Sequence, residues 1–257
     1  MKKKKFLWIV IFIISMTCII TCTVFIALYM NSGKQDYSEY KIETTASESG
    51  IDLDETNNSL SIPINFKKLQ KKNSDIYAWI KVPGTVIDYA VCQAGKGRDD
   101  FFYLSHNIYG NYEFAGSIYS EKQNALDFSD PVTVLYGHNM NNGSMFAGLD
   151  KFKSEKFFKK HDKIIIYLPD RILTYRIYAA YEYDNRHILN SFDFSDMEVV
   201  DSYFKSTLSP KSMVCNTREG ISLSTKDHII TLSTCVNSNS SLRYLVQGVL
   251  IKDERAE

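Results

Sequence analysis

Residues 229–235 read Ile-Ile-Thr-Leu-Ser-Thr-Cys, a largely apolar and β-branched run that ends on a cysteine and precedes the polar run Asn-Ser-Asn-Ser-Ser at 237–241. This composition predicts a buried β-strand that ends where the polar residues begin. A strand end holds a side chain in place, while the following loop leaves it accessible. A cysteine nucleophile needs both conditions and a neighbour that stabilises or generates its thiolate, so Cys235 is a candidate catalytic residue.

Two further residues occupy similar places in the sequence. His138 follows the apolar run 132–136 and precedes the mostly polar residues 139–143, so it also lies at the end of a predicted strand. Arg243 comes eight positions after Cys235 (243 − 235 = 8) and begins the last predicted strand, so a short loop would return it toward the cysteine. Histidine can exchange protons near neutral pH, and arginine stays charged and can donate paired N–H groups to a carbonyl or an oxyanion.

Most of the chain after residue 80 predicts short β-strands. Apolar, β-branched and aromatic residues cluster in the runs 82–91, 115–119, 132–136, 164–168, 172–183, 228–235 and 243–252. Strands at this density predict a mostly β domain, built as an antiparallel barrel or sandwich and not as a parallel sheet. Apolar residues at three- and four-residue steps predict helical insertions at about 144–161 and 193–208.

The segment before the first strand predicts helices. Apolar side chains recur there near helical spacing, at Phe66, Leu69, Ile76, Trp79 and Ile80. The polar residues 73–75 offer a helix cap before the second half of this segment. We therefore expect two short helices.

The first thirty residues have the composition of a membrane segment. Lysines at 2–5 precede the run 6–30, which contains no charged residue. At about 1.5 Å per residue, this run can cross a bilayer core of about 30 Å. Its length and the lack of a convincing small-x-small cleavage site favour an uncleaved signal anchor over a cleaved signal peptide. The lysines should stay in the cytoplasm, which places the rest of the chain outside.

Composition also suggests how the chain is divided. Residues 31–61 are rich in Ser, Thr, Asn, Asp and Glu, which predicts an extended linker in which no core begins. We expect a cytoplasmic basic tail at 1–5, a transmembrane anchor at 6–30, an extracellular linker at 31–61 and one catalytic domain at 62–257. The 30 basic and 30 acidic residues balance, so the overall charge gives no sign of a nucleic-acid partner.

The cysteines leave a question open. Cys18 and Cys22 lie in the apolar run, and the exported part keeps Cys92, Cys215 and Cys235, an odd number that leaves at least one thiol free. A Cys92–Cys215 bridge is compatible with the sequence. A bridge from Cys235 to either of them would remove the nucleophile and favour a non-catalytic exported binding module.

These motifs together resemble those of the sortase family. Residues 231–235, Thr-Leu-Ser-Thr-Cys, match the family's Thr-Leu-x-Thr-Cys signature, and residues 136–140, Tyr-Gly-His-Asn-Met, are similar to its histidine motif. Arg243 lies where the family's arginine lies. The resemblance covers roughly residues 67–252, which is nearly the whole predicted exported domain.

Class B sortases are the most similar class. Residues 77–85, Tyr-Ala-Trp-Ile-Lys-Val-Pro-Gly-Thr, resemble the class B segment that links the N-terminal helices to the first barrel strand. The predicted helix at 193–208 lies where class B sortases insert one between the sixth and seventh strands. Residues 31–61 show no aromatic lid motif of class C. The resemblance implies a closed antiparallel β-barrel of about eight strands with N-terminal helices and this inserted helix.

The resemblance also implies a cysteine transpeptidase. Cys235 would attack the Thr carbonyl of a C-terminal sorting signal, His138 would protonate the leaving amine, and Arg243 would lie beside them. An amine of a peptidoglycan precursor, or a pilin lysine in a polymerising enzyme, would then resolve the thioacyl intermediate. Ser233 and Thr234 are candidates for substrate binding or the oxyanion site, with satisfaction of the strand end as the alternative. The sorting motif stays open.

Some residues depart from the family pattern. Ala90 stands where proline is expected in Ile-Asp-Tyr-Pro-Val, and Glu121 ends a motif that usually ends in Asp. Val236 and Asn237 replace the acidic or aromatic residues often found after the cysteine. A papain-like hydrolase is disfavoured, because there the cysteine precedes the histidine along the chain.

No metal or other cofactor is expected. The remaining histidines lack metal-ligand spacing. They are His106, His161, His187 and His228.

Overall fold

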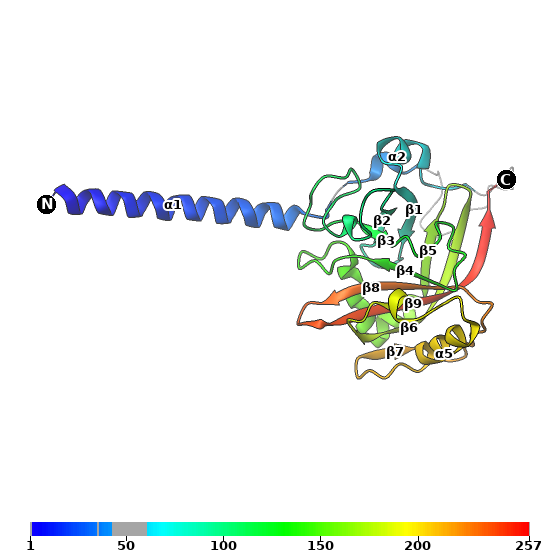
Figure 1. Ribbon diagram of the computed structural model, residues 1–257. Helices are drawn as coiled ribbons and strands as arrows, with labels where there is room; N and C mark the ends of the chain where they lie inside the picture. Colours follow the sequence, from blue (N-terminus) through cyan, green and yellow to red (C-terminus); the bar gives the residue numbers. More distant parts are fainter. Residues whose placement is uncertain (1, 35, 43–60, 257) are drawn as a thin grey trace.

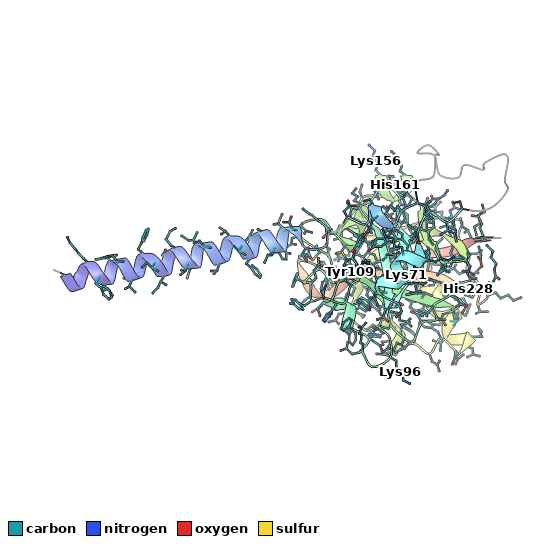
Figure 2. All side chains as sticks on the ribbon, turned by 90° about the horizontal axis from the view of Figure 1, so that it is seen from above. Lys71, Lys96, Tyr109, Lys156, His161 and His228 are labelled. Carbon is teal, nitrogen blue, oxygen red and sulfur yellow. The ribbon has the colours of Figure 1, made fainter. Side chains whose placement is uncertain are left out.

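A long N-terminal helix projects from a β-rich body. The computed structural model describes residues 2–34, 36–42 and 61–256. Figure 1 and the rotated view in Figure 2 both show helix α1 (Lys2–Asn31) leaving one side of the body. Within the described ranges, one helix is long and apolar enough to cross a membrane, and it covers Lys4–Asn31 of α1. The uncharged run 6–30 therefore forms a single helix, as the sequence predicts.

The body is built on one nine-stranded sheet. The strands are β1 (Ile76–Lys81), β2 (Asp88–Gln93), β3 (Ile118–Ser120), β4 (Val132–Tyr136), β5 (Lys163–Tyr167), β6 (Arg171–Asp184), β7 (Cys215–Thr217), β8 (Ile229–Val236) and β9 (Asn239–Arg255). Their order is β5-β1-β2-β3-β4-β8-β9-β6-β7, and a further β5–β6 pairing closes the first eight into a barrel. The predicted closed barrel of about eight strands is therefore confirmed.

The sheet is mixed, although the sequence predicts an antiparallel one. Strands β2 and β3 pair in parallel, and so do β4 and β8. Apolar patterning shows that a strand exists and which of its faces is buried, but it does not show which strand lies beside it. The β4–β8 pair in particular joins segments that are distant in sequence.

Several short helices connect the strands. They are η1 (Ser38–Tyr40), α2 (Phe66–Lys72), η2 (Phe102–Leu104), η3 (Phe146–Lys153), α3 (Glu155–Lys160), α4 (Ile188–Ser191) and α5 (Met197–Leu208). The predicted insertion near 144–161 is the pair η3 and α3. The predicted helix near 193–208 is α5, between β6 and β7, which are the sixth and seventh strands.

The prediction of a second N-terminal helix is wrong. Helix α2 ends at its C-cap Asn73, and Ile76–Lys81 forms strand β1. The first five residues of β1 are all buried. Ile80 faces the barrel interior, while Trp79 packs on the outside against the α2 side. A strand covered on both faces lacks the usual alternation, so its apolar residues imitate helical spacing.

Three apolar cores hold the body together. The barrel core fills the interior and includes Leu135 and Leu232. The α2 core lies between α2 and the outer face of β1 and β2, and it includes Leu69 and Trp79. The α5 core, with Phe204, packs α5 on the outer face of the sheet.

Part of the predicted linker belongs to the α2 core. Tyr40 in η1 is completely buried there, and its hydroxyl lies 3.1 Å from that of Tyr109. Lys41 forms a β-bridge with Ile64. The expectation that no core begins before residue 61 is therefore wrong for this segment. Residues 43–60 of the predicted linker lie outside the described residues.

Candidate active site

The two reactive side chains lie at the ends of neighbouring parallel strands. In the β4–β8 register Tyr136 pairs with Ser233. Continuing that register by two residues brings His138 level with Cys235. In the antiparallel β8–β9 register Cys235 pairs with Arg243. The strand registers thus align His138, Cys235 and Arg243 across three adjacent strands.

The alternation of side chains places these residues outside the barrel. Leu135 and Leu232 belong to the barrel core, while Val134 belongs to the α5 core on the outer face. Successive side chains in a strand point to opposite faces. Residues an even number of positions after the outward Val134 therefore point outward. Residues an odd number of positions after the inward Leu232 point outward as well. His138 and Cys235 occupy such outward positions and open to solvent instead of the apolar interior.

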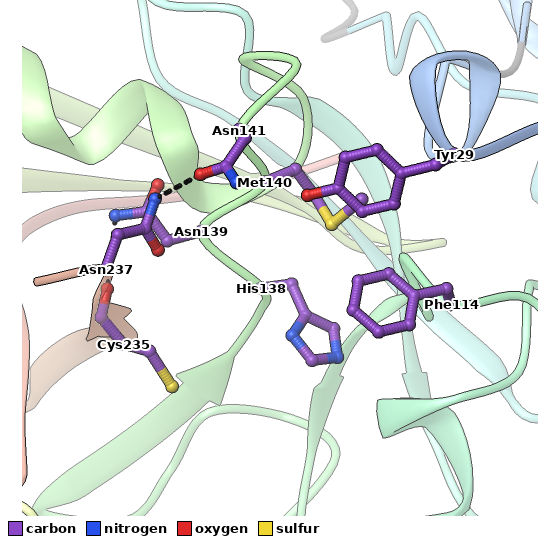
Figure 3. Close-up of a pocket in the computed structure, with 8 residues that line it drawn as sticks. All are labelled: Tyr29, Phe114, His138, Asn139, Met140, Asn141, Cys235 and Asn237. Atoms are coloured by element: carbon purple, nitrogen blue, oxygen red, sulfur yellow. Dashed lines mark hydrogen bonds between the residues drawn. The ribbon is translucent and has the colours of Figure 1, made fainter. Parts of the chain in front are cut away.

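A pocket of about 260 Å³ joins the two side chains. Figure 3 shows the Cys235 thiol and the His138 ring projecting into it, with a ring nitrogen on the side of the sulfur. The pocket is lined by Tyr29, Phe114, His138, Asn139, Met140, Asn141, Cys235 and Asn237. The structure therefore brings together the cysteine and the histidine that the sequence singles out.

The His138 ring is held on two sides. Its Nε2 lies 2.8 Å from the carbonyl oxygen of Leu104, and the ring stacks on Phe114 with centroids 5.7 Å apart. Because a carbonyl can only accept, this contact assigns the proton of a neutral ring to Nε2. The other nitrogen, Nδ1, is then left for proton exchange in the pocket.

Residues just after His138 fix the backbone of Cys235 and of the loop that follows it. The Asn139 side chain donates to the Cys235 carbonyl at 3.1 Å and to the Asp150 carboxylate at 3.0 Å. Asn237, just after the strand, donates to the side-chain oxygen of Asn141 at 2.9 Å. These bonds connect the loop after β8 to the loop after β4, which fixes the positions of the thiol and the imidazole relative to each other.

The cysteines differ in environment, and all five are free. Cys92 is buried in the α2 core, and this burial raises the pKa of its thiol well above the ordinary value. Cys215 packs against the α5 core, and partial burial also raises its pKa. Cys235 is exposed. The bridges that the sequence leaves open are not formed, which removes the argument for a non-catalytic binding module.

Arg243 lies beside Cys235 in register, but its side chain does not line the pocket. Its Nη1 donates to the carbonyl oxygens of Ser240 and Leu242, each at 3.0 Å. Burial raises the pKa of the buried Tyr119, Glu121 and Cys235 add to the rise, and Arg243 opposes it. Arg243 is thus the strand partner of Cys235, while its hydrogen bonds go to its own loop.

The two residues before the cysteine are buried. The Thr234 hydroxyl donates to the Gly137 carbonyl at 2.7 Å, next to His138. The Ser233 carbonyl accepts from the Gly137 N–H at 3.2 Å. Thr234 therefore uses its hydroxyl to join β8 to the histidine segment, which corresponds to the strand-end alternative. Ser233 lies at the same junction through its backbone.

Glu121, where the family pattern usually has Asp, is buried at the end of β3. Its carboxylate lies 2.7 Å from Nε2 of His187, the N-cap of α4. Burial raises the pKa of Glu121, and His187 opposes the rise. This pair joins the barrel to the α4 segment. Glu121 thus has a structural partner at the position where the family pattern has Asp.

Sequence reasoning missed much of the pocket lining. Tyr29 comes from the last turn of α1 and Phe114 from the loop before β3, and neither position carries a local signal of function. Among the residues that the structure describes, no group of three His, Cys, Asp or Glu side chains is placed to hold a metal ion.

Comparison with known proteins gives the family. The Sortase domain model matches residues 80–251. Sortase B of Listeria monocytogenes is 31% identical over 198 residues, which cover 76% of this chain and 78% of that protein. The X-ray structure of Clostridium perfringens sortase B is 35% identical with a TM-score of 0.65, covering 73% of this chain and 100% of that one.

A class B sortase of Streptococcus pyogenes involved in pilus biogenesis is also similar. It is 29% identical with a TM-score of 0.61, covering 72% of this chain and 99% of that one. The matched domain includes β4, β8 and most of β9, the strands that carry the site. The chain therefore belongs to the sortase family, within class B, and is a cysteine transpeptidase of the kind that anchors or links surface proteins.

Proposed function

We propose that this sortase cleaves a C-terminal sorting signal at its Thr, holds the protein as a thioacyl on Cys235 and transfers it to an amine of a peptidoglycan precursor. The observation that carries the proposal is the shared pocket of Cys235 and His138 at the ends of parallel strands. An exposed thiol with an imidazole beside it is the arrangement that covalent cysteine catalysis requires.

The reaction balances within the site. The Cys235 thiol gives its proton to Nδ1 of His138, the sulfur bonds to the Thr carbonyl carbon, the C–N bond to the next residue breaks, and the leaving amine takes that proton from His138. The acceptor amine then attacks the thioester carbon, gives a proton to His138 and releases the Cys235 thiolate. His138 then returns this proton to the Cys235 thiolate, which restores the thiol and the neutral imidazole, and no oxidant or reductant is consumed.

The role of Arg243 in this proposal is electrostatic. It is the strand partner of Cys235, and its guanidinium donates to two loop carbonyls that a substrate carbonyl could replace. A fixed cation there would stabilise the oxyanion that forms when the sulfur attacks.

The acceptor defines the biological role. The resemblance to the Listeria and Clostridium sortase B proteins supports anchoring to the cell wall as the first choice. The similarity to the Streptococcus enzyme involved in pilus biogenesis supports a pilin lysine as the second. Both acceptors are amines and use the same thioacyl intermediate.

We infer that the enzyme is a single-pass protein of the cell membrane, held there by α1. It is long and apolar enough to span the bilayer. The lysines at 2–5 favour a cytoplasmic N-terminus, so the catalytic domain lies outside the cell, where sorting signals emerge.

Substitution of the nucleophile and its partner tests the mechanism. With the full chain and a sorting-signal peptide, Cys235→Ala should abolish cleavage, because the thiolate has no substitute. His138→Ala should lower the rate by at least about 100-fold through loss of proton transfer. Cys215→Ala is the matched control and should keep wild-type turnover. Thioacyl formation and amine transfer are followed by mass spectrometry, and cleavage by Cys235→Ala would refute the mechanism.

The choice of acceptor needs a separate competition. A peptidoglycan-type oligoglycine or diaminopimelate amine and a pilin lysine peptide are offered together at equal concentration. Preferential transfer to the peptidoglycan-type amine supports anchoring, and preference for the lysine peptide overturns it in favour of polymerisation.

A further inference from the structure

The last turn of α1 is seated on the catalytic domain. Gly33 adopts φ +72°, the left-handed conformation that ends helices. The side-chain amide of Asn142 donates to the carbonyl oxygens of Tyr29, Met30 and Ser32 at 3.3, 3.1 and 2.9 Å. Carbonyls at a helix end lack partners within the helix. Asn142, which lies in the same loop after β4 as His138, therefore caps the end of α1.

The orientation of the Asn142 amide is set by its other contacts. Its oxygen accepts from the Ser144 N–H at 3.0 Å and from the Ser144 hydroxyl at 2.6 Å. The nitrogen therefore faces the helix, where it meets the carbonyl oxygens of Tyr29, Met30 and Ser32. An aspartate of the same shape would place an acceptor against these carbonyls.

Residues 32 and 33 fill a close-fitting seat. The Ser32 hydroxyl accepts from the Ala115 N–H at 3.1 Å, and the Gly33 N–H donates to Glu113 at 2.8 Å. A Cβ on Gly33 would lie 2.7 Å from the Ser144 hydroxyl oxygen and 2.9 Å from the Ala115 Cβ. Both Ser32 and Gly33 are buried. The helix end is thus docked by shape as well as by hydrogen bonds.

Docking brings an aromatic ring of the helix to the catalytic pocket. Tyr29 contacts Phe114 with ring centroids 5.6 Å apart, and Phe114 stacks on His138 at 5.7 Å. Figure 3 shows Tyr29 and Phe114 beyond His138 as seen from Cys235, on the wall opposite the thiol. In the proposed mechanism His138 exchanges protons with the leaving amine and with the incoming amine. The wall formed by Tyr29 and Phe114 therefore borders the part of the pocket where these amines lie.

We propose that Tyr29, held in place by the Asn142 cap, is a specificity-determining residue for the amine side of the pocket. The membrane helix then supplies one wall of the active site, in addition to any role as an anchor. The identity of the amine rests on the proposed function, whereas the docking of α1 on the domain does not.

Photo-crosslinking of the full chain in lipid nanodiscs tests the docking. p-Benzoylphenylalanine at position 29 should crosslink to the peptides that contain residues 112–114 or 138–142. The matched control is position 25, one turn earlier on the same helix face and 70% exposed, which should give no such crosslink. Asn142→Asp should lower the position 29 yield at least about threefold. Equal yields at 29 and 25, or no effect of Asn142→Asp, would overturn the docking.

Steady-state kinetics of the full chain test the specificity. Tyr29→Ala should raise KM for the acceptor amine by about 3- to 10-fold, a range typical of losing one aromatic contact, and should change KM for the sorting-signal peptide less than about twofold. Phe25→Ala should match the wild type, and Tyr29→Phe, which keeps the ring, should raise KM less than Tyr29→Ala. Equal KM values for Tyr29→Ala and Phe25→Ala, or a rise confined to the sorting-signal peptide, would overturn the assignment.

Failure of this inference and failure of the proposed mechanism give different results. Cleavage by Cys235→Ala would refute the thioacyl mechanism and leave the position 29 crosslink unchanged. Loss of the crosslink with normal Cys235-dependent transfer would refute the docked wall alone.

Discussion

At the residue scale, the reactivity of each thiol follows from its access to water. Cys235 is exposed, whereas Cys92 is buried with a raised pKa, so almost none of it is thiolate near neutral pH. Iodoacetamide at pH 8 should therefore modify Cys235 in the native protein and modify Cys92 only after unfolding. Peptide mass spectrometry before and after urea measures both sites. Rapid modification of Cys92 in the native state would contradict its placement in the α2 core.

Arg243 allows charge to be separated from geometry. Arg243→Ala should lower the acylation rate by about 100-fold, the loss typical of one oxyanion donor. Arg243→Lys keeps the charge but not the fork of N–H donors, so it should recover only part of that loss. Single-turnover acylation measures the effect. If Arg243→Ala acylates at the wild-type rate, the role assigned to Arg243 is wrong.

The sequence predicts the reactive residues better than it predicts their surroundings. Cys235 and His138 each follow an apolar strand, which is a local pattern, and both line the pocket. Tyr29 reads as one more apolar residue of a membrane helix, because its role depends on Asn142, more than a hundred residues away. A contact of that separation leaves no periodicity in a single sequence.

At the element scale, the direction of β4 relative to β8 decides whether a site exists. Both candidate residues follow the C-terminal ends of their strands, and only parallel neighbours bring two such ends to one edge. The sequence predicts both strand ends but favours antiparallel pairing, under which His138 and Cys235 would lie at opposite edges. The strand β1 is the other element misread, because burial on both faces hides its alternation.

The junction between β4 and β8 can be weakened without touching a reactive group. Thr234→Val keeps the shape of the side chain but leaves the buried Gly137 carbonyl without its hydroxyl donor. We expect a loss of about 1–3 kcal/mol in the free energy of unfolding and a lower kcat, since Gly137 precedes His138. Thermal unfolding and peptide cleavage measure the two effects.

Ser233→Ala is the comparison for Thr234→Val. Ser233 takes part in the junction through its carbonyl, which alanine retains, so its unfolding free energy should change by less than about 1 kcal/mol. A large catalytic defect in Ser233→Ala with normal stability would instead support the substrate-binding role that the sequence suggests.

At the scale of the whole molecule, the proposed orientation rests on the lysines in the first turn of α1. An impermeant maleimide added to intact cells should label Cys235, because the proposed orientation puts the domain outside. A cysteine introduced by Lys3→Cys, in a Cys235→Ala background, should be labelled only after the membrane is opened. Labelling of that cysteine in intact cells would contradict the orientation.

The parallel β4–β8 pair also affects when the enzyme becomes active. Val132 and its partner Ile229 are 97 residues apart in the chain (229 − 132 = 97). Pairing over such a separation requires closure of a long loop, which makes it slow compared with the formation of local hairpins such as β5–β6. The chain therefore has no thiol and imidazole side by side until its C-terminal strands have joined the sheet and the barrel has closed. An enzyme built this way is inactive until folding is complete.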